Sequence, residues 1–150
     1  MVRWVNRVWE LAKRDSITLK ADALTAEKDS LKRITHKTIR KVTQDIERFH
    51  FNTALAALME FTNALNAIWR EHGVDRGAWD HAIDVLLILF APIAPHFTEE
   101  LWEYRGRKYS IHNQPIPVWD PRLVEEEQVV LIVQVNGKLR DKFTISVTMD

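Results

Sequence analysis

The chain has 150 residues, of which 46% are hydrophobic and 28% charged, and its 21 basic residues balance its 21 acidic ones. This composition is typical of a soluble globular domain and excludes disorder as a global description. The zero net charge argues against a surface that is basic throughout, so nucleic acid would have to bind a local basic face. The chain has no cysteine, which excludes a disulfide framework and fits a cytoplasmic location.

Apolar residues recur at a spacing of three or four along the first two-thirds of the chain, which predicts amphipathic helices. Pro92 is expected to end one of them, and Pro95 is well placed as the first residue of the next. We therefore expect a mainly α protein, an antiparallel bundle of about five helices over residues 1–105. The predicted helices cover residues 2–14, 26–50, 53–71, 76–91 and 95–105.

Short polar side chains mark the expected starts of three of these helices. Thr25, Asn52 and Asp75 are the predicted N-caps of the second, third and fourth helices, because such side chains accept hydrogen bonds from the first helical N–H groups. Phe49 is assigned to the apolar stripe of the second helix. The sequence VLLILF, residues 85–90, is apolar on every face, which predicts burial by neighbours all round.

The sequence pattern changes after residue 105. Pro115, Pro117 and Pro121 are expected to exclude regular structure from a connector over residues 106–128. Trp119 is expected to be buried and to anchor this connector to the bundle. The connector is a candidate domain boundary.

Asn136-Gly137 then predicts a short β-hairpin over residues 129–150. A two-residue turn would place Val135 opposite Lys138 and Val133 opposite Arg140. Residues 129–133 are apolar on both faces, so this strand needs cover on both sides. We interpret the hairpin as the truncated start of a further domain, with open edges that are candidates for pairing with a second copy.

The sequence offers little for catalysis. The four glycines form no phosphate-binding loop, and the six histidines have no metal-ligand spacing. Glu99 and Glu100 are adjacent on a helix, so their side chains point in different directions and are expected to be N-terminal helix charges rather than an acid–base pair. We expect no catalytic residue, no metal site and no cofactor in this chain.

Basic residues gather on the second predicted helix. Arg33, Lys37, Arg40 and Lys41 recur at i, i+4, i+7 and i+8, which forms a ridge on one face, and His36 flanks it. Closely spaced cations of this kind can neutralise successive phosphates of a nucleic acid. The alternative is an ordinary solvated helix face.

Two smaller basic groups accompany the ridge: Arg3 with Arg7 at i, i+4, and Lys138, Arg140 and Lys142 on the hairpin. The tryptophans fall mostly on apolar stripes, so no exposed aromatic row for stacking bases is expected. Contact with sugar-phosphate backbone is therefore favoured over base reading.

Three stretches resemble one family. FAPIAPHFTEELW, residues 90–102, is similar to the anticodon-binding helix bundle of the leucyl, isoleucyl and valyl class I aminoacyl-tRNA synthetases. HKTIRKVTQDIERFHFNTALAALMEF, residues 36–61, resembles bacterial-type leucyl-tRNA synthetase, and VQVNGKLRDK, residues 133–142, resembles the start of that enzyme's C-terminal domain.

The resemblance implies a C-terminal part of an enzyme that ligates leucine to tRNA(Leu) with ATP and Mg. It implies that the catalytic and editing domains of the synthetase are partners in the parent chain, that this part is inactive alone, and that no membrane is involved. It also implies contact with the inner side of the tRNA rather than with its anticodon.

Two alternatives stay open. The same domain of a valyl or isoleucyl enzyme is opposed by the sequence VNGKLR, residues 135–140. A helical protein–protein interaction module without an RNA role is favoured by the zero net charge.

Overall fold

The computed structural model describes residues 2–14, 24–71, 74–124, 128–135 and 138–146. The elements in these ranges are α1 (Val2–Lys13), α2 (Leu24–Glu47), α3 (Phe51–Glu71), α4 (Arg76–Phe90), α5 (Pro95–Tyr104), the 3-10 helix η1 (Ile111–Asn113), α6 (Pro121–Val124), β1 (Gln128–Val135) and β2 (Lys138–Ser146). The protein is mainly helical, and the five helices expected from periodicity are confirmed. The segments between the first and second predicted helices and between the third and fourth lie largely outside the described residues.

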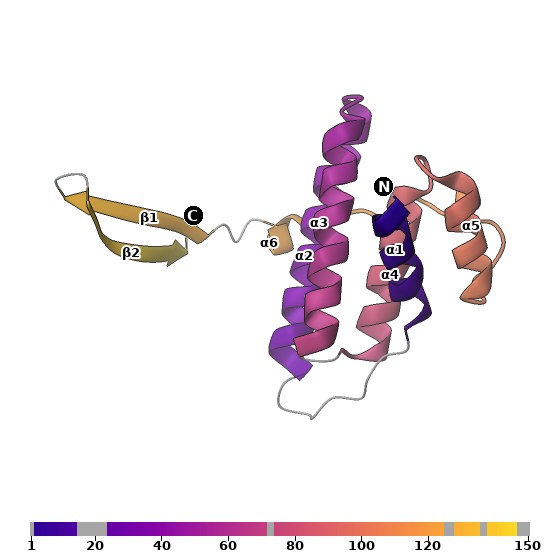
Figure 1. Cartoon of the computed structure of the whole chain (residues 1–150), viewed down its shortest axis with the longest axis horizontal. Helices are drawn as coiled ribbons and strands as arrows, with labels where there is room; N and C mark the ends of the chain where they lie inside the picture. The colour runs from indigo at the N-terminus through magenta and orange to yellow at the C-terminus, as the bar shows by residue number, and fades with distance from the viewer. Residues whose placement is uncertain (1, 15–23, 72–73, 125–127, 136–137, 147–150) are drawn as a thin grey trace.

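The long helices pack around α3 (Figure 1). α2 and α3 form a long hairpin, and α4 packs against both. α1 lies on the other flank of α3 from α2, and α5 packs on α4. The bundle thereby presents two outer flanks, one formed by α2 and one by α1 with α5.

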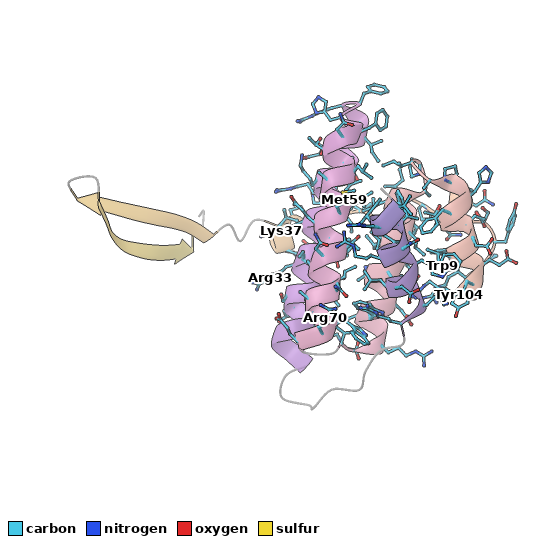
Figure 2. The ribbon with its side chains drawn as sticks, viewed as in Figure 1. Trp9, Arg33, Lys37, Met59, Arg70 and Tyr104 are labelled. Carbon is cyan, nitrogen blue, oxygen red and sulfur yellow. The ribbon has the colours of Figure 1, made fainter. Side chains whose placement is uncertain are left out.

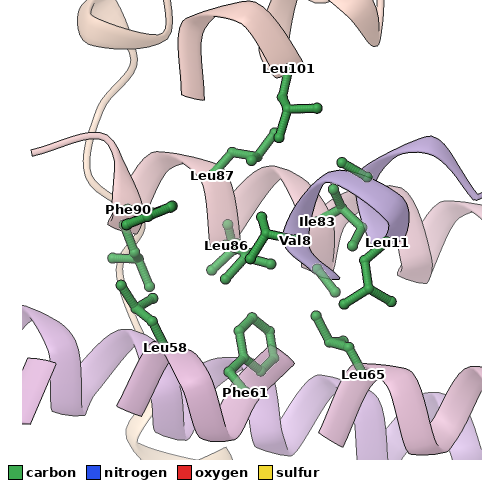
Figure 3. Close-up of a cluster of buried hydrophobic side chains, with 14 of the residues drawn as sticks. Val8, Leu11, Leu58, Phe61, Leu65, Ile83, Leu86, Leu87, Phe90 and Leu101 are labelled. Atoms are coloured by element: carbon green, nitrogen blue, oxygen red, sulfur yellow. The ribbon is translucent and has the colours of Figure 1, made fainter. Parts of the chain in front are cut away.

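Figure 3 shows the part of the core between α1, α3, α4 and α5, and the core continues to Leu31, Ile39 and Val42 of α2. Burial of large apolar side chains is its main source of stability, at about 25 cal/mol per Å² removed from water. The prediction for residues 85–90 is confirmed, since Ile88 alone among these six is only half-buried. The labelled core side chains are Val8 and Leu11 of α1, Leu58, Phe61 and Leu65 of α3, Ile83, Leu86, Leu87 and Phe90 of α4, and Leu101 of α5.

Two of the four helix starts are as predicted. Asp75 caps α4, where its carboxylate accepts a hydrogen bond of 3.1 Å from the N–H of Ala78. Pro95 is the first residue of α5. The N-caps predicted at Thr25 and Asn52 are wrong, because α2 begins at Leu24 and α3 at Phe51.

The corner between α2 and α3 also differs from expectation. α2 ends at Glu47, and Phe49 adopts φ 59° with 79% of its surface exposed. Its assignment to the apolar stripe is therefore wrong. The backbone N–H of His50 donates to the carbonyl of Asp45 at 2.7 Å, which closes the corner, and the carbonyl of His50 accepts from Ala54 at 3.1 Å in the first turn of α3.

The connector contains regular structure, contrary to the prediction. Ser110 caps η1 by accepting a hydrogen bond from the N–H of His112. Pro121 begins α6, a position where proline's fixed φ suits a helix and its missing N–H costs nothing. α6 packs on α2 and buries Val124, while Trp119 is half-buried against the core.

β1 and β2 pair in antiparallel fashion, with Val135 opposite Lys138 as expected. A register shift follows between Val133 and Gln134, so that Val133 lies opposite Asp141. The predicted pairing of Val133 with Arg140 is wrong because β2 has an extra residue at this point, as in a β-bulge. The turn residues Asn136 and Gly137 lie outside the described residues.

Candidate nucleic-acid interface

The basic ridge of Arg33, Lys37, Arg40 and Lys41 lies on the outer flank of α2. Arg33, Lys37 and Lys41 are exposed, and Arg40 is half-buried. Figure 2 shows Arg33 and Lys37 on the side of α2 away from α1. The spacing of the four basic residues along α2 therefore places them on one continuous face of the helix.

Two shallow hollows follow this ridge. Arg33 and Lys37 line one of about 490 Å³ together with Asp29, Ser30 and Ile34 of the same helix. Lys37 and Lys41 line a second, of about 200 Å³, whose other wall is α3, including Glu60 and Phe61. Lys37 lies in both hollows, so it is the central cation of the ridge.

The ridge cations differ in how strongly their charge is compensated. Nζ of Lys41 lies 2.6 Å from the Asp45 carboxylate, which is nearly buried. That hydrogen bond is the main reason why the pKa of Asp45 is lowered, and it offsets much of the charge of Lys41. Within the part of the chain that the structure describes, Lys37 forms no ion pair. Lys37 is therefore better suited than Lys41 to bind a phosphate.

His36, which flanks the ridge, makes a structural contact that the sequence did not predict. Its Nδ1 accepts a hydrogen bond of 2.9 Å from the backbone N–H of Asp120. The pKa of His36 is lowered by burial first, and then by His81 and Lys32. A neutral ring with an occupied Nδ1 holds the connector on α2 and does not add a positive charge to the ridge.

The pair on α1 lies on the opposite flank from the ridge. Arg3 and Arg7 are both exposed, and Nη1 of Arg7 donates to the Asn63 side chain of α3 at 3.0 Å. α3 lies between α1 and α2 (Figure 1). Lys138 and Arg140 both lie on β2, the second strand of the hairpin.

Sequence reasoning missed two exposed features. Phe49 and Phe51 project at the α2–α3 corner with ring centroids 6.2 Å apart, an exposed aromatic pair that the sequence did not predict. The positive φ of Phe49, which no helical pattern reveals, turns its ring outward. The second feature is a group of cations gathered from the ends of α1, α4 and α5, which are far apart in the sequence.

Ser110, His112 and Glu99 lie close together, but their geometry is not that of a catalytic triad. The hydroxyl of Ser110 donates to the Glu99 carboxylate, which also accepts from the N–H of Ile111 at 3.2 Å. Nε2 of His112 lies 3.6 Å from Glu99 and does not activate the serine. Glu99 therefore organises the connector, and its expected role as a simple helix-terminal charge is incomplete.

Metal sites and membrane spans can be assessed over the described ranges. Among these residues, no three His, Asp or Glu side chains are grouped so as to hold a metal ion. None of the described helices combines the length and the apolar character needed to cross a membrane.

The family model of the anticodon-binding domain of tRNA ligases matches residues 30–150. The chain therefore belongs to this family, a class of helical domains found in tRNA ligases.

Within this family, relatives that are similar to this chain in sequence are leucine–tRNA ligases. Those of Dehalococcoides mccartyi strain BAV1 and Rubrobacter xylanophilus are 46% and 44% identical over 95% of this chain and 17% of their own length. A LeuRS of Agrobacterium radiobacter K84, solved in a ternary complex with tRNA and LeuAMS, superposes with a TM-score of 0.69 at 36% identity, over 99% of this chain and 19% of that one. The chain thus spans about a sixth of the length of the curated relatives that it matches.

Proposed function

We propose that this chain binds and positions tRNA as part of a longer leucine–tRNA ligase. The observation that carries the proposal is the exposed basic ridge on α2, in a chain of the anticodon-binding family. The solved LeuRS complex, which contains tRNA, supports the choice of ligand.

The chemistry of the ridge favours contact with sugar-phosphate backbone. Lysine and arginine at successive turns of a helix face neutralise phosphates, and such contacts position an RNA without reading its sequence. The sequence similarity to leucine–tRNA ligases, rather than the ridge, supports the choice of tRNA(Leu).

The parent protein would ligate leucine to tRNA(Leu) with ATP and Mg in the cytoplasm. Its catalytic and editing steps would occur in other parts of that protein. We divide the present chain into a tRNA-binding bundle at 1–105, a connector at 106–128 and a hairpin at 129–150 that contributes to the next domain.

The test is a titration of the chain with leucine tRNA at salt concentrations between about 50 and 200 mM, since each phosphate contact contributes about −0.7 to −0.9 to the slope of log K against log salt. We expect weak binding with a clearly negative slope. Salt-independent binding, or none at millimolar protein, would contradict the proposal and favour a protein-interaction module. A leucine-dependent ATP–pyrophosphate exchange by the chain alone would contradict its lack of catalysis.

A further inference from the structure

A polar hollow of about 290 Å³ lies where the end of α1, the start of α4 and the end of α5 meet. No described residue of α2 lines it, so it is distinct from the basic ridge. The charged residues that line this basic pocket are Lys13, Arg14, Arg76, Asp80, Arg105 and Arg107.

Carboxylates compensate only part of the positive charge in the basic pocket. Arg105 pairs with Asp80 at 2.9 Å and with Asp84 at 3.4 Å, and Arg107 pairs with Asp84 at 2.9 Å. Arg76 lies 3.8 Å from Asp80. Among the described residues no other carboxylate pairs with these cations, so two carboxylates face five cations and three positive charges are in excess.

Neutral groups hold the two cations contributed by the end of α1. Nζ of Lys13 lies 5.9 Å from the ring centroid of Trp9 and 5.7 Å from that of Tyr104. These contacts orient the ammonium group without neutralising it, because a ring attracts a cation through its quadrupole alone.

The guanidinium of Arg14 is held in the same way. It lies 4.6 Å from the ring centroid of Trp69, and its Nη1 donates to the neutral Asn66 side chain at 2.7 Å. The pocket therefore contains positioned cations whose charge is left for an anion. Phosphate oxygens are suitable partners for arginine, because the guanidinium donates several hydrogen bonds in a fixed plane.

We propose that the basic pocket binds a backbone phosphate of tRNA and forms a second anchoring point for the RNA that the basic ridge contacts. The inference rests on the proposed function. Figure 2 shows the separation of the two surfaces: Arg33 and Lys37 lie on one flank of α3, and Trp9 and Tyr104 lie on the other. Two separated phosphate contacts fix the orientation of an RNA, whereas one surface alone leaves it free to rotate.

The test compares two double variants of the chain in titrations with leucine tRNA. Lys13→Gln/Arg76→Gln removes two charges from the pocket, and Lys108→Gln/Arg122→Gln removes two exposed charges from residues that line neither the pocket nor the ridge. Thermal unfolding of both variants checks that they fold. We expect the pocket variant to weaken binding at 0.1 M salt by roughly 3- to 10-fold and to flatten the salt slope by about 0.7 to 0.9, the change for one phosphate contact, while the control leaves the slope unchanged.

The outcomes separate this inference from the proposed function. If the pocket variant binds tRNA like the control while substitution of the ridge weakens binding, the pocket proposal is overturned and tRNA binding stands. If the unsubstituted chain does not bind tRNA, both fail. A second arm titrates inorganic phosphate at constant ionic strength and follows the NMR signals of Lys13 and Arg76. If these NMR signals shift and saturate with phosphate, and the pocket variant binds tRNA with unchanged affinity, the pocket is a site for free phosphate. That result would overturn the RNA assignment.

Discussion

Nδ1 of His36, on α2, accepts a hydrogen bond of 2.9 Å from the backbone N–H of Asp120, although 84 positions separate the two residues. The bond attaches the segment before α6 to the long helix that also carries the basic ridge. The ring can accept this bond only while Nδ1 is unprotonated. Burial, His81 and Lys32 lower the pKa of His36, and the Asp120 carboxylate raises it to a smaller extent, so the bond forms at neutral pH.

This contact is expected to make attachment of the connector depend on pH. The pKa of His36 in the folded chain is below its ordinary value of 6.5, so the folded state binds the proton less readily than the unfolded state. The stabilisation is therefore complete above about pH 6.5 and decreases as the pH falls from there to the lowered folded pKa. Hydrogen exchange of the Asp120 amide, corrected for its intrinsic pH dependence, measures this loss.

His36→Asn is the matched control for the pH experiment. Its side-chain oxygen can replace Nδ1 as an acceptor but does not titrate. The variant is expected to keep the Asp120 amide protected between pH 5 and 7. Loss of protection at the same pH in both proteins would assign the effect to another group.

A buried hydrogen bond joins α1 to α3. Nε1 of Trp4 donates to Oγ1 of Thr62 at 3.1 Å, and both residues are almost completely buried. Thr62→Val would leave the indole N–H unpaired, at an expected cost of about 1–3 kcal/mol in the free energy of unfolding. Urea denaturation measures this cost, and Thr53→Val, at an exposed threonine of the same helix, is expected to change stability far less. Equal effects of the two substitutions would contradict the assignment.

Arg105 connects three helices. Its guanidinium donates to the Ala12 carbonyl at 2.9 Å and pairs with Asp80 and Asp84, while only 8% of its side chain is exposed. Arg105→Ala would leave this buried site without its cation, and we expect a loss of roughly 2–4 kcal/mol, less than for a fully buried pair because both carboxylates reach solvent.

Arg76→Ala provides the comparison for Arg105. The Arg76 side chain is 83% exposed, and its Nε lies 3.8 Å from the Asp80 carboxylate. We therefore expect the free energy of unfolding to change by less than about 0.5 kcal/mol. Chemical denaturation of the two variants tests the difference. Similar losses would show that Arg105 contributes no more than a surface charge.

The N-cap of α4 provides a smaller test. Asp75→Ala removes the acceptor for the Ala78 N–H and is expected to cost about 1 kcal/mol, whereas Asp75→Asn keeps an acceptor oxygen and is expected to cost less. Thermal unfolding distinguishes the two variants. An equal loss in both would mean that the charge, and not the cap, is responsible.

The features that the sequence predicted correctly are those that depend on neighbouring residues within one segment. The periodicity that predicts the helices acts within one segment, as do the cap at Asp75 and the proline at position 95. The exposed basic ridge follows from helical spacing for the same reason. Asn52 was misassigned because short polar residues also occur in the first turn of a helix, where α3 places it.

The remaining features depend on contacts between distant segments. The bond between His36 and Asp120 arises only when the connector packs on α2. The cations of the basic pocket come from the ends of three helices, and no spacing in the sequence relates Arg14 to Arg76 or Arg107. The outward turn of Phe49 depends on a positive φ at the α2–α3 corner, which a helical pattern does not reveal.

The central claim is that the basic ridge binds tRNA, and the salt dependence of the variant Arg33→Ala/Lys37→Ala/Arg40→Ala tests it most directly. Titration with leucine tRNA at several salt concentrations should give a lower affinity and a slope of log K against log salt that is less negative by about 2 to 3 than that of the unsubstituted chain. An unchanged affinity and slope in a variant that still folds would contradict the account and leave the ridge as a solvated helix face.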